Sequence, residues 1–325
     1  SSLLVLSQIR KRIKKNKKKK KYFENIKSKL IIKNLDFSLT GDQIKVIDEI
    51  NKDLKSDYKM FRILQGDVGC GKTIVSFIAA SNVIESNYQT AMMAPTEILA
   101  KQHFNLAKQM FASCKINIEL LTGKTKSIEK KKIQKDLLNG KIDLIIGTHA
   151  LFQRNIRFKN LGLVIIDEQH KFGVKQRIEL AKKGASECDI LLMSATPIPR
   201  TLVMTVYGDM DISKINEKPK NRKEIITLSK PEEKLDEILS FVKKQIESGN
   251  QIFWVCPLIE ESKKLNYSAA VKKYNFLSSK FGNQVGLVHG ALDKDDKDNV
   301  LYNFLKKKIN ILVSTTVIEV GIDFP

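Results

Sequence analysis

The feature that most constrains the fold is a glycine-rich loop, Gly66-Asp67-Val68-Gly69-Cys70-Gly71-Lys72-Thr73, which has the pattern G-x-x-x-x-G-K-T. An apolar run, Phe61 to Leu64, precedes the loop, and a helical pattern begins at Ile74. A strand, such a loop and a helix in this order cradle a polyphosphate, because the loop amides and the first N–H groups of the helix face the negative charge. The pattern predicts a nucleotide site in an α/β fold. Lys72 would contact the β and γ phosphates, and the Thr73 hydroxyl would bind Mg²⁺.

The charge of the chain is high and uneven. The 325 residues carry a formal net charge of +21, and residues 1–35 hold thirteen Lys or Arg against the single acid Glu24. Such an excess favours a polyanionic partner such as nucleic acid. Only 8 of the 57 basic residues are Arg, so a general lysine-rich composition is an alternative explanation. For the lysine run at 14–21 two interpretations stay open, a solvated charged segment or a contact with a phosphate backbone.

The cysteines and the apolar runs favour a cytoplasmic protein. The four cysteines show no C-x-x-C spacing, so we expect buried free thiols in a reducing compartment rather than disulfides, a redox site or a metal site. No apolar stretch has the length of a membrane span, and the residues before the first charges do not follow the order of a signal peptide. The chain starts without Met and stops at Pro325 after a strand pattern, so we expect a fragment of a longer protein.

Beyond the loop, short apolar runs alternate with helical patterns, which predicts a parallel sheet covered by helices. The expected strands are 90–94, 144–147, 163–167 and 190–194, and the expected helices include 97–111 and 127–138. In such sheets ligands gather at the carboxyl ends of the strands, so the residues after each run are the candidates for chemistry.

Two further groups of residues fit a nucleotide site. Asp167 and Glu168 follow an all-apolar run. One carboxylate there can hold Mg²⁺ and its neighbour can orient or deprotonate the attacking water. His170 could lie near the γ-phosphate and signal its loss. Gln43 lies in the first turn of a helix that we expect from Asp42 to Leu54 with Thr40 as N-cap, and its amide suits the edge of adenine.

The second half repeats an α/β pattern without a second phosphate loop. We expect a helix at 232–247, strands at 252–256, 285–289 and 309–314, and a helix at 294–307. The sequence thus divides into a basic connecting helix or linker at 1–34, a first lobe at 35–215, a linker at 216–230 and a second, incomplete lobe at 231–325.

With these residues identified, the chain resembles the superfamily 2 helicases of the DExH type, and in particular the RecG family of bacterial DNA helicases. The resemblance covers nearly the whole length. It rests on the phosphate loop and on blocks that include Leu39-Thr40-x-x-Gln43, Ala94-Pro95-Thr96-Glu97, Gly147-Thr148-His149, Asp167-Glu168-Gln169-His170, Ser194-Ala195-Thr196, Cys256-Pro257-Leu258 and Ser314-Thr315-Thr316.

The resemblance implies two RecA-like lobes of the P-loop NTPase type, with ATP and Mg²⁺ between them and DNA across them. Ser194 and Thr196 would couple the state of the γ-phosphate to lobe movement, and Gly321 and Asp323 would face the nucleotide from the second lobe. Strand phosphates would be held without reading of sequence. The residues implied for that contact are Pro95, Thr96, Thr122, Gly123, Thr148, Thr315 and Thr316.

The activity implied is that of a cytoplasmic, monomeric, ATP-dependent helicase or translocase acting on branched DNA. It would regress replication forks and migrate Holliday junctions in recombination and repair. The sequence ends before the Q-x-x-G-R-x-G-R block of the family, whose arginines stabilise the transferred phosphoryl group, so we expect poor turnover by this chain alone. Three alternatives stay open: a duplex translocase of the transcription-repair coupling type, an RNA helicase, and a nucleic-acid-binding module with a vestigial nucleotide site.

Overall fold

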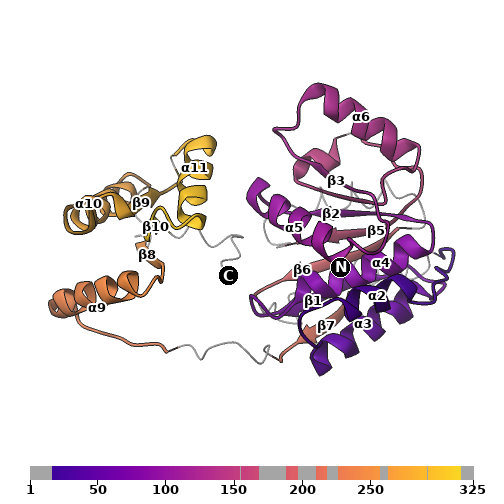
Figure 1. Cartoon of the computed structure of the whole chain (residues 1–325), viewed down its shortest axis with the longest axis horizontal. Helices are drawn as coiled ribbons and strands as arrows, with labels where there is room; N and C mark the ends of the chain where they lie inside the picture. The colour runs from indigo at the N-terminus through magenta and orange to yellow at the C-terminus, as the bar shows by residue number, and fades with distance from the viewer. Residues whose placement is uncertain are drawn as a thin grey trace, which may run out of the picture. The chain divides into compact units, whose positions relative to one another are not determined.

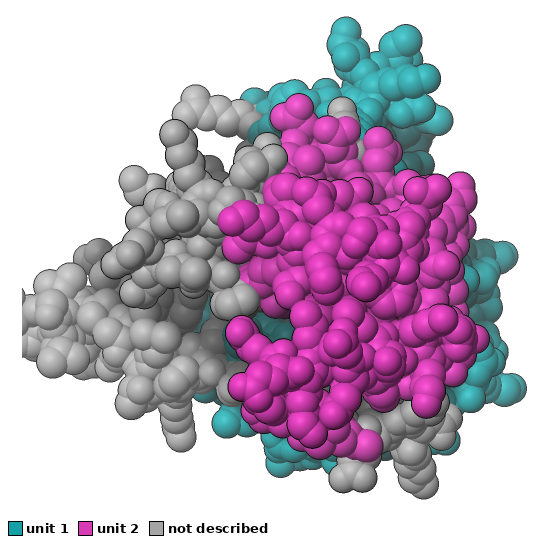
Figure 2. Space-filling model, turned by 90° about the vertical axis from the view of Figure 1, so that its left-hand side faces the viewer, with its two compact units in different colours: residues 1–222 teal, residues 223–325 magenta. Residues whose placement is uncertain are grey.

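The computed structural model describes residues 17–153, 155–167, 188–196, 210–217, 226–256, 263–290 and 292–315. The chain divides into two compact units, residues 1–222 and residues 223–325 (Figures 1 and 2). Each unit contains a parallel sheet, so the predicted α/β class with two parallel-sheet lobes is confirmed.

The first unit is built on a seven-stranded sheet with the order β3-β4-β2-β5-β6-β1-β7. Every neighbouring pair of its strands is parallel. The sequence did not predict the two outer strands, β3 and β7, because both are partly exposed and lack a continuous apolar run. The strands are β1 (Phe61–Gly66), β2 (Gln89–Met93), β3 (Ile118–Leu121), β4 (Leu144–Gly147), β5 (Leu161–Ile166), β6 (Asp189–Ser194) and β7 (Asp211–Ile215).

Helices cover both faces of this sheet. Adjacent residues of one strand enter different cores: Leu64 packs in one apolar cluster with α3, α4 and α5, whereas Ile63 packs in another with α6. Burial of both faces is the reason that the inner strands read as continuous apolar runs. The described helices are α2 (Ile26–Lys33), α3 (Gly41–Leu54), α4 (Lys72–Glu85), α5 (Glu97–Met110), α6 (Ser127–Leu138) and the 3₁₀ helix η1 (His149–Phe152). Both α2 and α3 pack against α4 (Figure 1).

Two of the helices begin at threonine caps beside the predicted site. The Thr40 hydroxyl accepts a hydrogen bond from the Gln43 backbone N–H at 3.3 Å, and the Gln43 side-chain oxygen accepts one from the Thr40 N–H at 2.9 Å. This reciprocal capping box starts α3, as the N-cap expected at Thr40 requires. Thr96 caps α5 in the simpler way, through the Leu99 N–H.

Two lysines of the run at 14–21 fit neither of the interpretations that the sequence left open. Lys18 and Lys21 are fully buried, and both ammonium groups pair with the Asp189 carboxylate, at 2.8 and 2.6 Å. These two lysines are therefore neither solvated nor available to DNA phosphates. Lys17, Lys19 and Lys20 stay exposed. Of the connecting segment expected at 1–34, the described part is an extended stretch from residue 17 followed by α2.

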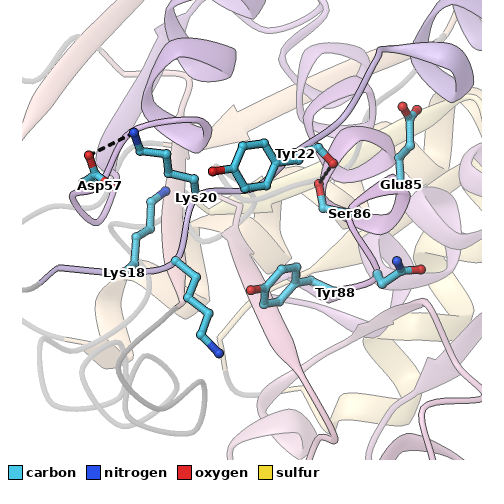
Figure 3. Close-up of a pocket in the computed structure, with 9 residues that line it drawn as sticks. Lys18, Lys20, Tyr22, Asp57, Glu85, Ser86 and Tyr88 are labelled. Carbon is cyan, nitrogen blue, oxygen red and sulfur yellow. Dashed lines mark hydrogen bonds and ion pairs between the residues drawn. The ribbon is translucent and has the colours of Figure 1, made fainter.

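A cavity of about 770 Å³ is lined in part by Lys18 (Figure 3). It lies near the amino ends of β1 and β2, at the edge of the sheet opposite to the phosphate loop. Its polar side chains tie the N-terminal segment to the unit. Lys20 pairs with Asp57, the Glu85 carboxylate accepts from the Glu24 and Lys27 N–H groups, and the Ser86 hydroxyl donates to the Tyr22 carbonyl.

The second unit is a three-stranded parallel sheet with the order β8-β10-β9. The helix expected from Glu232 begins as a 3₁₀ turn, and the α-helix ends before Gly249, whose φ is +81°. None of the helices in the described ranges is long and apolar enough to cross a membrane. The elements are η4 (Glu232–Lys234), α9 (Leu235–Glu247), β8 (Ile252–Cys256), α10 (Lys263–Phe281), η5 (Gly282–Gln284), β9 (Val285–Val288), α11 (Lys294–Leu305) and β10 (Ile311–Thr315).

Candidate functional site

The glycine-rich loop connects β1 to α4, as the sequence predicts. Gly69 and Gly71 have φ values of +76° and +90°, in the left-handed region where a side chain is strained. A Cβ on Gly66 would lie only 2.5 Å from the Cys70 sulfur and 2.8 Å from the Ile215 carbonyl oxygen. Asp67, Val68 and Gly69 form the exposed crest of the loop. These contacts explain why the loop requires glycine at three of its positions.

Lys72 and Thr73 begin α4 immediately after the loop. The Lys72 ammonium donates to the Gly66 and Asp67 carbonyls at 2.7 and 2.9 Å, so the cation lies inside the loop. Thr73 stands in the first turn of a helix whose N-terminal N–H groups favour anions.

Gln43 is attached to the same loop. Its Nε2 donates to the Cys70 carbonyl at 2.9 Å, and its amide lies against the position that a side chain on Gly71 would occupy. Only 2% of Gln43 is exposed. The side chain thus supports the loop from behind, while its contact with adenine stays a prediction.

Cys70 is a structural part of the loop. It is 1% exposed, and burial raises the pKa of its thiol although Lys72 lies nearby. All four cysteines are buried and free, as expected. A thiol that remains protonated and covered is a poor nucleophile.

Asp167 follows β5, and it meets a partner that the sequence analysis did not single out. The His103 Nε2 lies 2.8 Å from the Asp167 Oδ2, and the two side chains are 5% and 11% exposed. His103 stands on the buried face of α5 with Leu99, Ala100 and Ala107. The signal was present in the sequence, because a histidine at the spacing of the apolar stripe has to enter the interior.

Ser194 ends β6, next to the strand that delivers the loop. It pairs in register with Gln65 of β1 and is fully buried. Its hydroxyl lies 3.1 Å from the Thr196 carbonyl oxygen and 3.2 Å from the Thr196 hydroxyl, and Thr196 is exposed. The two predicted coupling residues therefore contact each other at the carboxyl edge of the sheet.

The residues implied for DNA contact gather at the other half of this edge. Pro95 and Thr96 follow β2, Thr122 and Gly123 follow β3, and Thr148 follows β4. The segments after β2 and β3 lie close together here. Glu97, the residue after Thr96, has its Oε1 3.2 Å from the position that a Cβ on Gly123 would take. In the second unit Thr315 ends β10 and is 4% exposed.

Five of the predicted site residues lie outside the described ranges, namely Glu168, His170, Thr316, Gly321 and Asp323.

The strand order separates the two groups of the first unit. The carboxyl ends of β3, β4 and β2 carry the residues implied for DNA, and the ends of β5, β6 and β1 carry Asp167, Ser194 and the phosphate loop. Asp167 stands at the boundary, because β5 pairs with β2 on one side and β6 on the other.

These residues suit MgATP. The left-handed glycines, the ammonium inside the loop and the helix start fit a polyphosphate. The Thr73 hydroxyl and the Asp167 carboxylate are oxygen ligands, which Mg²⁺ prefers. They are the residues that could hold the metal ion.

Residues 40–205 match the DEAD/DEAH box helicase family, and residues 231–325 match the helicase conserved C-terminal domain. The chain is 47% identical over 324 residues to the ATP-dependent DNA helicase RecG of Thermotoga maritima, covering 99% of this chain and 41% of that protein. RecG of Bacillus subtilis is 48% identical over 305 residues, with coverage of 93% and 45%. The chain thus spans less than half the length of these curated relatives.

Solved structures show the same likeness. A structure of RecG bound to a three-way DNA junction matches with a TM-score of 0.85 and 43% identity, covering 99% of this chain and 42% of that one. The DEAD-box helicase Mss116 bound to single-stranded RNA matches with a TM-score of 0.65 over 92% of this chain and 65% of that one, and at 19% identity it shows a shared fold. The chain has two RecA-like helicase lobes, of which the second is small. It belongs to the DEAD/DEAH box helicase family, within which it is similar to the RecG helicases over nearly its whole length.

Proposed function

We propose that this chain is the motor of an ATP-dependent DNA helicase that acts on branched duplexes, regressing replication forks and migrating Holliday junctions. The observation that carries the proposal is the order of residues along one edge of the sheet. The residues predicted to bind ATP are neighbours there of the residues implied for DNA contact. Similarity to RecG, one structure of which holds a three-way junction, supports DNA as the partner.

The proposed reaction divides the work among residues of the first lobe. The loop amides and Lys72 would bind the β and γ phosphates, and Thr73 and Asp167 would hold Mg²⁺, whose charge would offset the negative charge on the phosphoryl group. Glu168 orients or deprotonates the attacking water, and His170 responds to the γ-phosphate. Ser194 and Thr196 transmit the change to lobe movement, and Gly321 and Asp323 contact the nucleotide from the second lobe.

DNA contacts complete the proposed cycle. The threonine and backbone groups after β2, β3 and β4, with Thr315 and Thr316 of the second lobe, hold strand phosphates without reading sequence. The domains proposed for these roles are 35–215 and 231–325, joined by a linker at 216–230.

The test is ATP hydrolysis by this chain under single-turnover conditions, which reveal slow rates, with no DNA, linear duplex or a synthetic fork of equal length. We expect the fork to stimulate most, and Glu168→Gln and Lys72→Ala to abolish hydrolysis while Lys45→Ala, an exposed lysine of α3, does not. Equal stimulation by duplex and fork would favour a translocase of the repair-coupling type. Activities that survive Lys72→Ala would mean a vestigial nucleotide site.

A further inference from the structure

The Asp167 carboxylate is held by a residue from outside the phosphate-loop half of the site. The imidazole of His103 approaches it from α5, 64 residues earlier in the chain, with 2.8 Å between Nε2 and Oδ2. The pair is almost covered, at 5% and 11% exposure. A hydrogen bond that water scarcely reaches restricts the orientation of both groups more strongly than an exposed one.

The chemistry of Asp167 decides the direction of this bond. A carboxylate that binds a metal ion can only accept, so with the ion bound to Asp167 the His103 Nε2–H would be the donor. A group that hydrogen-bonds to a metal-ligating carboxylate fixes its orientation. His103 is thus placed to orient the Asp167 carboxylate.

The helix that carries His103 begins at the residues implied for DNA. Thr96 caps α5, and His103 follows seven residues later, about 10 Å along the axis at 1.5 Å per residue. Between them Leu99 and Ala100 are buried in the core, so this part of α5 is packed as a rigid piece. A displacement of Thr96 by a DNA strand would therefore reach the His103 imidazole.

We propose that His103 is a positioning residue that holds the Asp167 carboxylate in the orientation for Mg²⁺, and that α5 connects it to the strand-phosphate contacts at Pro95 and Thr96. The inference rests on the proposed function, because it assumes that Asp167 binds Mg²⁺ with ATP. The hydrogen bond between His103 and Asp167 would then connect the residues implied for DNA contact, after β3, β4 and β2, with the ATP site after β5, β6 and β1.

The first experiment measures the Mg²⁺ concentration at half-maximal binding of a fluorescent ATP analogue to the full chain, without DNA. His103→Leu replaces the imidazole with an apolar side chain of similar size that has no donor. His103→Gln keeps an N–H donor near the position of Nε2. The packing control is Met110→Ala, which shortens another buried side chain of α5 and leaves the hydrogen bond between His103 and Asp167 in place. Loss of such a partner typically weakens metal affinity by about 10- to 100-fold.

We expect His103→Leu to raise the Mg²⁺ midpoint by about 10- to 100-fold, with His103→Gln and Met110→Ala near the wild type. A wild-type midpoint in a folded His103→Leu protein would overturn the inference. A defect of the same size in His103→Gln would assign the effect to packing of the ring and overturn the hydrogen-bond role. If His103→Leu does not fold, His103→Asn, whose shorter amide cannot reach Asp167, takes its place beside His103→Gln.

The second experiment follows communication with DNA at saturating Mg²⁺. We expect His103→Leu to lose more of the fork-stimulated hydrolysis than of the basal hydrolysis, and His103→Gln to restore the ratio. An unchanged ratio would overturn the connection through α5. A wild-type chain that binds no ATP would overturn the proposed function together with this inference, whereas the outcomes above overturn the inference alone.

Discussion

The Asp189 carboxylate lies 2.8 Å from the Lys18 ammonium with neither side chain exposed, although 171 residues separate them in sequence. Asp189 also pairs with Lys21 and accepts from the Met60 N–H at 2.7 Å. Burial lowers the pKa of Lys18, because loss of hydration outweighs the attraction of the carboxylate. The start of β6, the approach to β1 and the N-terminal segment are therefore joined at one buried charge cluster.

Replacement of Asp189 by Asn should destabilise the first unit severely. Two buried ammonium groups would lose their counter-charge, and breaking a buried pair in this way costs about 3–5 kcal/mol. The measurement is the free energy of unfolding in urea. The control is Asp57→Asn, which breaks an exposed pair with Lys20 and should cost below about 1 kcal/mol. Equal losses in the two variants would contradict the role of the cluster.

Replacement of Gln43 by Ala should weaken nucleotide binding by about 2- to 10-fold, the value of one ordinary hydrogen bond. The bond that supports the loop is the one from Nε2 to the Cys70 carbonyl. The bond from the Thr40 N–H to the Gln43 side-chain oxygen, which caps α3, is lost as well. Binding of ATP and GTP analogues separates two roles. If Gln43 supports the loop alone, both affinities fall equally. If it also reads adenine, the preference for ATP falls as well.

Asp42 should give the first unit an acid-sensitive contact. Its carboxylate accepts from the Asn216 and Glu217 N–H groups at 2.7 and 3.0 Å, and these bonds hold its pKa below the ordinary value of 3.8. Because the pKa of Asp42 is lower in the folded state, its contribution to the stability of the folded state is complete above pH 3.8. That contribution disappears as the pH falls through the folded pKa. An NMR titration should place the Asp42 midpoint below 3.8 in native protein and at the ordinary value in urea. A native midpoint at or above 3.8 would contradict these bonds.

Cys188 should resist alkylation in the native protein. Burial raises its pKa to about 12, so at pH 8 the thiolate is about a thousandfold rarer than for a thiol of ordinary pKa. Iodoacetamide labelling followed by mass spectrometry should detect its modification only on the timescale of unfolding. Rapid labelling without denaturant would mean that the start of β6 opens easily.

Local patterns were sufficient for much of the fold. The apolar runs placed β1, β2, β4, β5 and β6 within two residues of their observed starts, and the Thr40 cap placed α3. The phosphate loop could be predicted from its sequence alone, because its left-handed glycines, its lysine and the start of the following helix all lie within eight adjacent residues. Outer strands were harder, since β3 and β7 expose part of their side chains and lack the apolar signal.

The sequence by itself determined the α/β class, the two lobes and the residues at the ends of the strands, because periodicity, caps and glycine geometry act between neighbours in the chain. The tertiary structure alone decided which strands are adjacent and that His103 contacts Asp167. It also decided that the side chains of Lys18 and Lys21 are buried although they belong to a highly charged run. The contacts of Lys18, Lys21 and His103 join groups 64 to 171 residues apart, which share a dielectric environment and a hydrogen bond only once the chain is packed.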